Sequence, residues 1–594
     1  MKSPIDLGVH ALRSAYAAGT LRVGQVIDEV QARIAAAGDD KVWISRVSDA
    51  ELQAAAVKLD ARRGELASLP LFGIPFAVKD NIDVAGLATT AACPGFAYKP
   101  ESSAEVVRRL VAAGAIVIGK TNLDQFATGL VGVRSPYGVP KNPFDSAFIP
   151  GGSSSGSAVA VAAGLVSFAL GTDTAGSGRV PAAFNNIVGL KPTPGSISNE
   201  GSVPACRSLD CISVFALSSA DADAVLKLLA EPQVTPAISE SFRFGVLGSA
   251  DAEFFGDAAY SSLYAQAVVR MNAMGGTAVE IDYAPFRGAA ELLYSGPWVA
   301  ERTAAVGAFI EGARESDVWP ATREIILRGR KYSAVDAFEG QYKLAAFKAQ
   351  AEAQWNDLAF LMLPTAGTIY RVADIEREPM LYNIHLGRYT NFVNFFGLSA
   401  LALPAGFRAD GLPFGVTLIG RPHAERALLA LGARWQRALA LPLGKTLSRL
   451  PSAECDPKID ADRLLIAVVG AHMAGLPLNG ELTRLGGRFE RTCRTAPVYR
   501  LFALTGGSVD RPGLVRVPKD GGSIELELWS LPSDKVGAFL RNIPPPLGLG
   551  TVALGDGSSA TGFLCESHAT VGARDITELG GWRAYLQSIA KSSS

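Results

Sequence analysis

Helix-like and strand-like segments alternate along most of this 594-residue chain, and the alternation limits the folds that it can adopt. The stretch SAEVVRRLVAAGAIVIGKTN, residues 103–122, has apolar residues at helical spacing, then Gly114, then a short apolar run typical of a buried strand. Comparable alternation continues to about residue 440. It predicts an α/β fold with a central mixed β-sheet surrounded by helices.

The pattern changes near residue 441. The following segment carries prolines and charges without a period, which predicts a linker over residues 441–462. Beyond it, LLIAVVG and several further strand-like stretches alternate with glycine-rich turns. We therefore predict a large domain over residues 1–440 and a smaller C-terminal α+β domain over residues 463–594.

Composition excludes several classes of function. The 56 basic and 57 acidic side chains give a net charge of −1, so neither nucleic acid nor an anionic membrane is an expected partner. The longest apolar run, residues 158–170, is shorter than the ~20 residues of a membrane span, and we expect a buried core helix there. The N-terminal segment lacks the apolar stretch of a signal peptide, and six sparse cysteines indicate a reducing compartment, so we expect a cytoplasmic protein.

Two motifs point to chemistry that their surroundings do not support. Residues 114–121, GAIVIGKT, match a phosphate-binding loop letter for letter, but the residues between the glycines have the pattern of a strand rather than a flexible turn. Residues 152–156 match the G-x-S-x-G nucleophile elbow with Ser154 at its centre, which requires a histidine base. His385 and His423 are the candidates for that base, and neither lies in a run of polar residues. No metal-ligand motif occurs, so neither a metal nor a cofactor is expected.

Three separated stretches carry a more specific signal: GIPFAVKDN around Lys79, PGGSSSGSA around Ser153 and LGTDTAGSGRVPAA around Ser177. In order and spacing they resemble the amidase signature family over residues 1–440. The resemblance implies that Ser177 is the nucleophile, Ser153 the bridge and Lys79 the base, with a cis peptide bond between Gly152 and Ser153. Ser154 is then a bystander.

This arrangement needs no histidine. A serine hydroxyl becomes a nucleophile when a base takes its proton, and a lysine is a base only when it is neutral. Burial beside the apolar strand before Lys79 favours the neutral amine. The run of Thr174, Ala175, Gly176 and Ser177 offers backbone N–H groups for an oxyanion hole. Asp173 and Arg179 are expected to hold this loop rather than to react.

The stretch KTNLDQFATGLVGVRSPYG, residues 120–138, resembles the allophanate hydrolase branch of the family. That branch implies a tyrosine and an arginine around the substrate carboxylate, and LYSGPWVAERTA supplies Tyr294 and Arg302. We expect a helix to begin at Gly296-Pro297, with Arg302 on its second turn and Tyr294 on the loop before it. Gly129 is expected to line the same pocket with its backbone.

The smaller domain has a family-like stretch of its own, VVGAHMAGLPLNGEL, residues 468–482. The resemblance implies that the first domain releases ammonia from allophanate and that the second decarboxylates the product, N-carboxycarbamate, with His472 as base. An alternative is that the carbamate decays unaided and the domain serves assembly. Glu566 has the pattern of a buried-strand acid, either a further polar group of that site or the end of the strand.

The remaining expectations concern partners and competing functions. Members of the family often dimerise, so a homodimer is expected. No biotin-attachment stretch occurs, so a fused urea carboxylase is not expected and the functional link would be to a separate one. The breakdown of urea, of biuret and of an s-triazine all stay open as the source of allophanate. Competing functions are an amidase for another small or aryl amide, a glutamine amidotransferase component of a tRNA-dependent complex, and a non-enzymatic scaffold.

Overall fold

The fold is described from a computed structural model, which describes residues 5–66, 68–231, 238–448, 450, 462–504, 511–555 and 559–592. The chain divides into two compact units. The first comprises residues 1–12, 21–61 and 69–450, and the second residues 13–20, 62–68 and 451–594. Much of the expected linker, residues 449 and 451–461, lies outside the described residues.

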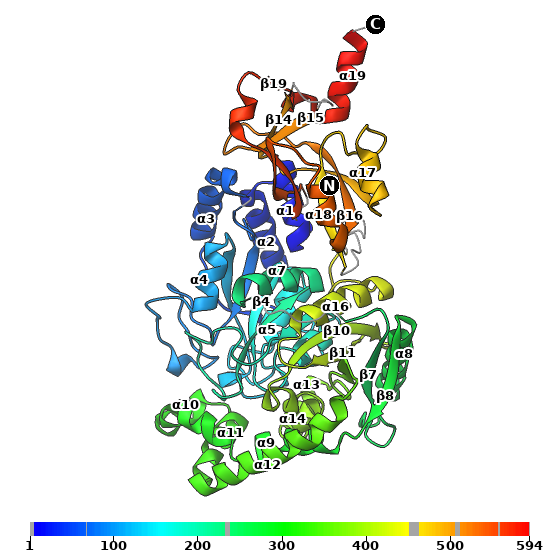
Figure 1. The fold of residues 1–594 in the computed structure, drawn as a ribbon. Coiled ribbons are helices and arrows are strands. Elements are labelled where there is room, and N and C mark those ends of the chain that lie inside the picture. Colours follow the sequence, from blue (N-terminus) through cyan, green and yellow to red (C-terminus); the bar gives the residue numbers. More distant parts are fainter. Residues whose placement is uncertain are drawn as a thin grey trace. The chain divides into compact units, whose positions relative to one another are not determined.

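The first unit is built on one large mixed sheet, as the sequence predicts (Figure 1). Among the described residues the strand order is β1-β3-β2-β4-β6-β5-β10-β11-β9-β7-β8. Strands β2 and β3 are parallel, as are β2 and β4, whereas β4 and β6 are antiparallel. The strands are β1 (Trp43–Arg46), β2 (Pro75–Lys79), β3 (Ile116–Thr121), β4 (Phe168–Asp173), β5 (Val188–Lys191), β6 (Cys211–Ala216), β7 (Phe242–Leu247), β8 (Gly276–Ile281), β9 (Phe360–Pro364), β10 (Ser399–Phe407) and β11 (Pro413–Gly420).

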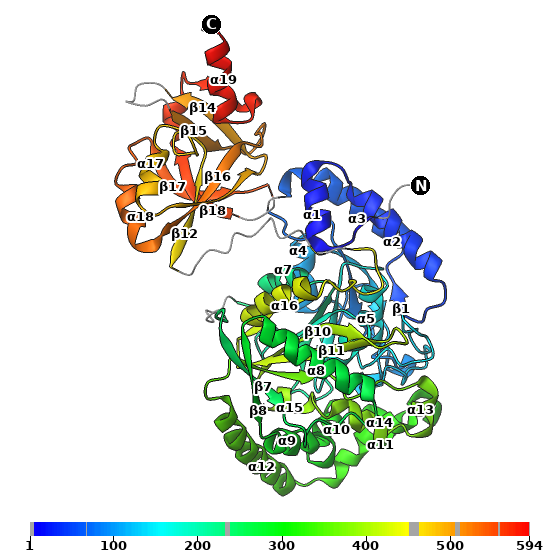
Figure 2. The same cartoon turned by 90° about the vertical axis from the view of Figure 1, so that its right-hand side faces the viewer.

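Helices surround this sheet, and α9, α10, α11 and α12 gather at one end of the unit in both views (Figure 1, Figure 2). The central strands β2, β4 and β6 are buried along their whole length, which explains their almost continuous apolar sequence. Helix α1 (Val9–Ala18) begins in this unit, and its residues from Arg13 onward belong to the second unit. The other helices are α2 (Val23–Ala37), α3 (Asp49–Ala61), α4 (Glu105–Ala112), α5 (Ser155–Ala162), α6 (Val180–Phe184), α7 (Ser219–Leu229), α8 (Ala258–Ala273), α9 (Ala284–Ser295), α10 (Val299–Gly312), α11 (Pro320–Arg328), α12 (Ala334–Glu352), α13 (Val372–Arg377), α14 (Leu381–Gly387), α15 (Asn391–Phe395) and α16 (Glu425–Leu439).

The apolar run of residues 158–170 is not one helix, contrary to the expectation. Helix α5 ends at Ala162, Gly164 turns the chain with a φ of +67°, and Phe168 begins β4. A left-handed turn at glycine interrupts the helix without steric cost. The described helices include none that is both long and apolar enough to cross a membrane.

The second unit is a smaller α+β structure. Its described strands form two sheets, in the orders β13-β16-β12-β18-β17 and β15-β14-β19. Side chains of strand β16 point alternately to the two faces of the larger sheet. Leu526 and Leu528 pack in one apolar cluster on one face, and Trp529 and Leu531 pack in another on the opposite face. Both faces of the sheet are therefore covered. The elements are β12 (Arg463–Val468), α17 (Asn479–Arg484), β13 (Arg488–Arg494), β14 (Tyr499–Leu504), β15 (Arg511–Arg516), β16 (Glu525–Pro532), α18 (Ser533–Leu540), β17 (Leu547–Ala553), β18 (Ser559–Cys565), β19 (Arg574–Asp575) and α19 (Trp582–Ser592).

Candidate active site

Two neighbouring parallel strands bring the candidate triad to one edge of the large sheet. Lys79 is the last residue of β2, and Ser177 follows the end of the adjacent β4. The carboxyl ends of parallel strands lie at the same edge. Ser153 precedes α5, whose first turn is tied to β4 because Ser154 Oγ donates a hydrogen bond to the carbonyl of Thr172 at 3.1 Å. This bond accounts for Ser154 as a structural residue.

Lys79 is fully buried and is held by two hydroxyls. Its Nζ lies 2.8 Å from Ser153 Oγ and 2.7 Å from Thr172 Oγ1. Burial lowers the pKa of Lys79 from its ordinary value to about 7, although the carboxylates of Asp124 and Asp210 act in the opposite direction. The amine is therefore available as a base near neutral pH.

The backbone around Ser153 is fixed by Asp124, a residue that we did not predict. The Gly152–Ser153 peptide bond is cis, as the resemblance implies. The Asp124 N–H donates to the Ser153 carbonyl at 3.0 Å, and the Asp124 carboxylate accepts from the amides of Gly132 and Arg134 at 2.9 Å. A Cβ at Gly152 would lie 2.1 Å from Asp124 Oδ2, so the position accepts glycine alone.

The turn that carries Ser177 is held by the buried ion pair of Asp173 and Arg179, which confirms their expected role. Arg179 Nε and Nη2 each donate to the Asp173 carboxylate at 2.9 Å, and the Gly176 and Gly178 amides donate to it at 2.8 and 2.9 Å. Burial by itself raises the pKa of Asp173, but Arg179, Lys191 and the Gly178 amide together outweigh it, so the pKa lies below its usual range. The Gly176 amide faces Asp173, which removes it from the expected oxyanion hole.

Arg302 and Tyr294 lie together, although on different elements from those expected. Tyr294 belongs to the last turn of α9, which ends at Ser295, and α10 begins at Val299, so Arg302 lies on its first turn. Arg302 Cζ is 6.0 Å from the centre of the Tyr294 ring. The helix boundary was wrong because the Gly296 amide still bonds the Leu292 carbonyl and closes α9.

Arg302 is an isolated buried cation next to the Gly129 loop. It is 2% exposed, and its Nη1 donates to Thr128 Oγ1 at 3.0 Å. Within the described part of the chain, no carboxylate forms an ion pair with it. A buried guanidinium without an anionic partner is costly, and an anionic ligand relieves this cost. Gly129 follows Thr128 directly, with a φ of +152°.

In the second unit, His472 forms a pair with Glu481. Their Nε2 and Oε2 atoms are 3.2 Å apart, and both side chains are largely buried. Burial lowers the pKa of His472, and Glu481 opposes that shift. Of the two alternatives for Glu566, a further polar group of the site or the end of the strand, the structure agrees with the second, although the side chain is not buried. It follows the end of β18, its side chain is 66% exposed, and it contacts the exposed His568.

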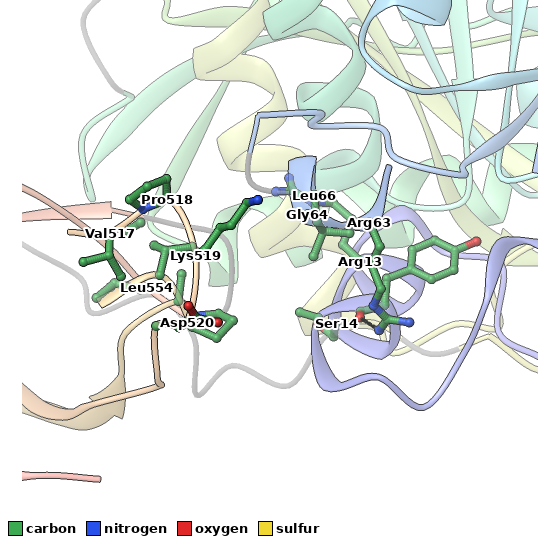
Figure 3. Close-up of a pocket in the computed structure, with 18 residues that line it drawn as sticks. Arg13, Ser14, Arg63, Gly64, Leu66, Val517, Pro518, Lys519, Asp520 and Leu554 are labelled. Carbon is green, nitrogen blue, oxygen red and sulfur yellow. Dashed lines mark hydrogen bonds between the residues drawn. The ribbon is translucent and has the colours of Figure 1, made fainter. Parts of the chain in front are cut away.

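The motifs set aside in the sequence have ordinary structural roles here. The segment that matches a phosphate-binding loop contains strand β3, over residues 116–121, as predicted. His385 Nδ1 bonds the hydroxyl of Tyr370 at 2.6 Å and its ring stacks on Phe255. The second unit has a cavity of about 310 Å³ lined by residues that include Arg13, Arg63 and Lys519 (Figure 3). None of its lining residues, all of them described, is a predicted site residue.

Comparison with known proteins finds matches over most of the chain. The family model described as Amidase matches residues 25–429, and the model described as Allophanate hydrolase C-terminal domain matches residues 464–587. The urea amidolyase of Saccharomyces cerevisiae is 42% identical over 583 residues, which cover 93% of this chain and 32% of that protein. The chain thus spans about a third of the length of the urea amidolyases that it matches.

Two further matches differ in how much of this chain they cover. A glutamyl-tRNA(Gln) amidotransferase component from Chloroflexus aggregans is 33% identical over 474 residues, covering 73% of this chain and 96% of that protein. The solved structure of Kluyveromyces lactis allophanate hydrolase covers 99% of this chain and 100% of that one, with 38% identity and a TM-score of 0.72. The chain belongs to the amidase family and carries the allophanate hydrolase C-terminal domain.

Proposed function

We propose that this protein hydrolyses allophanate, urea-1-carboxylate, through an acyl-enzyme on Ser177. The observation that carries the proposal is the 2.8 Å contact between Ser153 Oγ and a buried lysine amine whose pKa is about 7. A lysine in this state accepts a proton at neutral pH without a histidine or a metal.

The reaction follows from the roles of the three side chains. Ser177 Oγ attacks the terminal amide carbon while its proton passes to Ser153, which gives its own proton to Lys79. The N–H groups of Thr174, Ala175 and Ser177 stabilise the oxyanion, each such donor contributing about 3 kcal/mol. The proton returns through Ser153 to the departing nitrogen, and ammonia leaves. Water then cleaves the acyl-enzyme by the same proton path and releases N-carboxycarbamate.

Arg302 and Tyr294 are proposed to bind the substrate carboxylate, with Gly129 beside them. The support is the charge balance, since the guanidinium is buried and its described hydrogen bond goes to a hydroxyl rather than to a carboxylate. A substrate that carries one negative charge close to its scissile amide complements this arrangement.

The second unit is proposed to decarboxylate N-carboxycarbamate, with His472 as the base. Its neutral imidazole is favoured by burial, and Glu481 holds the ring at Nε2. His472 takes the proton of the carboxyl group and returns it to the nitrogen as carbon dioxide leaves, which gives carbamate. Carbamate takes one more proton from water and breaks down to a second ammonia and a second carbon dioxide.

We also propose the setting of the reaction. It needs no cofactor, takes place in the cytoplasm in a homodimer, and follows a urea carboxylase that makes allophanate. The five described cysteines are free thiols, in keeping with a reducing compartment. The relatives named urea amidolyase are the support for the link to a carboxylase.

The test is ammonia release by the full-length protein from allophanate, malonamate, biuret and an aryl amide. Preferred turnover of allophanate is expected, with complete loss in Ser177→Ala. For Arg302→Ala, a KM increase of about 10- to 100-fold is expected from the loss of a charge-assisted bond. Preference for the aryl amide with an unchanged Arg302→Ala variant favours the alternative, an amidase for another amide. Stable copurification with tRNA favours a role in an amidotransferase complex instead.

A further inference from the structure

A pocket of about 590 Å³ lies in the first unit next to the Tyr294–Arg302 pair. Tyr294 lines it, and so does Asn383, whose side-chain oxygen accepts a hydrogen bond from the amide of Leu130, the residue after Gly129. The pocket therefore borders the proposed carboxylate site. None of the triad residues lines it.

The link between α14 and α15, residues 388–390, and the first residue of α15, Asn391, form part of the wall of this pocket and carry an unusual set of polar atoms. Arg388 Nε, Thr390 Oγ1 and Asn391 Oδ1 are all buried and have no hydrogen-bond partner among the described residues. Buried polar atoms without partners are costly and rare, and three within four residues call for an explanation.

The backbone of this link is rigidly held, so the unpaired side-chain atoms are not a sign of a loose segment. The Tyr283 hydroxyl donates to the Arg388 carbonyl at 2.7 Å. Arg179 Nη1 donates to the Thr390 carbonyl at 3.1 Å, and Arg179 is itself bound to Asp173 in the nucleophile turn. The link and the turn that carries Ser177 are therefore one hydrogen-bonded structure.

The three atoms lead from the pocket to the nucleophile. Arg388 and Asn391 line the pocket, and Asn391 is 5% exposed. Thr390 is fully buried and its hydroxyl faces Gly176, the residue before Ser177, because a Cβ at Gly176 would lie 2.4 Å from Thr390 Oγ1.

Three arginines line the pocket, and Arg388 is the one that has no ion pair with a carboxylate among the described residues. Arg287 pairs with Asp251 at 2.9 Å, and Arg328 pairs with Glu324 at 2.6 Å. The remaining carboxylate of the lining, Glu291, is exposed. Arg388 forms no ion pair within the described residues, and its guanidinium lies over the Tyr389 ring at 5.7 Å.

The unpaired atoms also define the chemistry of a ligand. An Arg Nε–H donates to a carboxylate or carbonyl oxygen, an Asn oxygen accepts from an N–H, and a hydroxyl does either. A small planar anion with a carboxylate and amide N–H groups satisfies all three. We propose that residues 388–391 bind the anionic urea derivative on its way to Ser177, with Arg388 on its carboxylate, Asn391 on its nitrogen and Thr390 beside the scissile amide.

This inference rests on the proposed function, and the test uses two variants of the full-length protein. Arg388→Gln removes the charge, and Thr390→Val removes the hydroxyl without changing the side-chain size. Each is expected to lower kcat/KM for allophanate by about tenfold, Arg388→Gln mainly through KM. Arg330→Gln, which removes an exposed guanidinium that pairs with Glu311 and does not line the pocket, is the matched control and is expected to stay within about twofold.

The thermal unfolding temperature of Thr390→Val distinguishes a role in binding from a role in the fold, because loss of a structural hydroxyl would lower that temperature. Since Thr390 Oγ1 has no partner among the described residues, Thr390→Val is expected to unfold at the same or a higher temperature than the wild type while losing activity. A variant that loses both stability and activity contradicts the inference, because it assigns the hydroxyl to the fold.

The remaining outcomes separate this inference from the proposed function. If the wild type hydrolyses allophanate and both variants match it, the inference is overturned and the proposed function stands. If the wild type does not hydrolyse allophanate, calorimetric binding of malonamate to Ser177→Ala decides. Binding weakened about tenfold by adding Arg388→Gln supports the site, and binding unchanged by it overturns the site.

Discussion

At the scale of single residues, the buried amine of Lys79 sets the pH dependence of the proposed reaction. Its pKa of about 7 means that a growing share of the enzyme carries an ammonium group, which cannot accept a proton, as the pH falls below 7. We expect kcat/KM for allophanate to fall about tenfold per pH unit below that point and to level off above it. Steady-state rates between pH 5 and 9 check this. A value of kcat/KM that does not change with pH around 7 would contradict the assignment of Lys79 as the base.

The same residue affects stability. Because the pKa of Lys79 is about 7 in the folded protein and about 10.4 in the unfolded chain, the unfolded chain binds more protons between these values. Lys79 therefore makes the free energy of unfolding rise with pH in this window. We expect Lys79→Met to abolish activity and to reduce that slope in urea unfolding experiments at pH 7 and 10. The exposed Lys227→Met is the control, and an equal reduction there would contradict the assignment.

At the scale of elements, the turn between β4 and α6 depends on a fully buried ion pair. Asp173→Asn would leave Arg179 charged and without its carboxylate, which we expect to cost about 3–5 kcal/mol in the free energy of unfolding. The exposed pair of Glu311 and Arg330 is the comparison, and Glu311→Gln is expected to cost less than about 1 kcal/mol. Chemical denaturation of the two variants measures both values. Equal losses would show that the buried pair does not hold the turn.

Some helices and strands could be predicted from the sequence, and others could not. Helix α4, the turn at Gly114 and strand β3 follow directly from local pattern, because glycine ends a helix and an apolar run suits a buried strand. The sequence pattern did not predict features that depend on contacts between segments distant in the sequence. Glu566 continues an alternating run, which left a buried site residue and the end of the strand as alternatives; the strand ends at Cys565 and the Glu566 side chain is exposed. Asp124 gave no local signal, since its partners Gly132 and Ser153 are brought to it by the fold.

At the scale of the whole molecule, the two units are expected to carry out separate steps. In full-length His472→Ala, the first ammonia should be released from allophanate at the wild-type rate, while the second appears more slowly because N-carboxycarbamate then decays without a base. Time-resolved ammonia and carbon dioxide measurements check this. His568→Ala, another histidine of the second unit and an exposed one, is the control. Simultaneous release of both ammonia molecules by His472→Ala would assign the second unit to assembly.

The packing around Gly152 has a consequence for how this protein can change over generations. Any side chain at that position meets the Asp124 carboxylate, and it also meets the Gly132 amide, where a Cβ would lie 2.5 Å away. The two neighbours are bonded to each other, so neither can withdraw alone. In a library with every codon at position 152, selected on allophanate as nitrogen source, glycine should be recovered almost without exception. A side chain at this position would therefore need simultaneous changes at positions 124 and 132, within one short stretch of the gene.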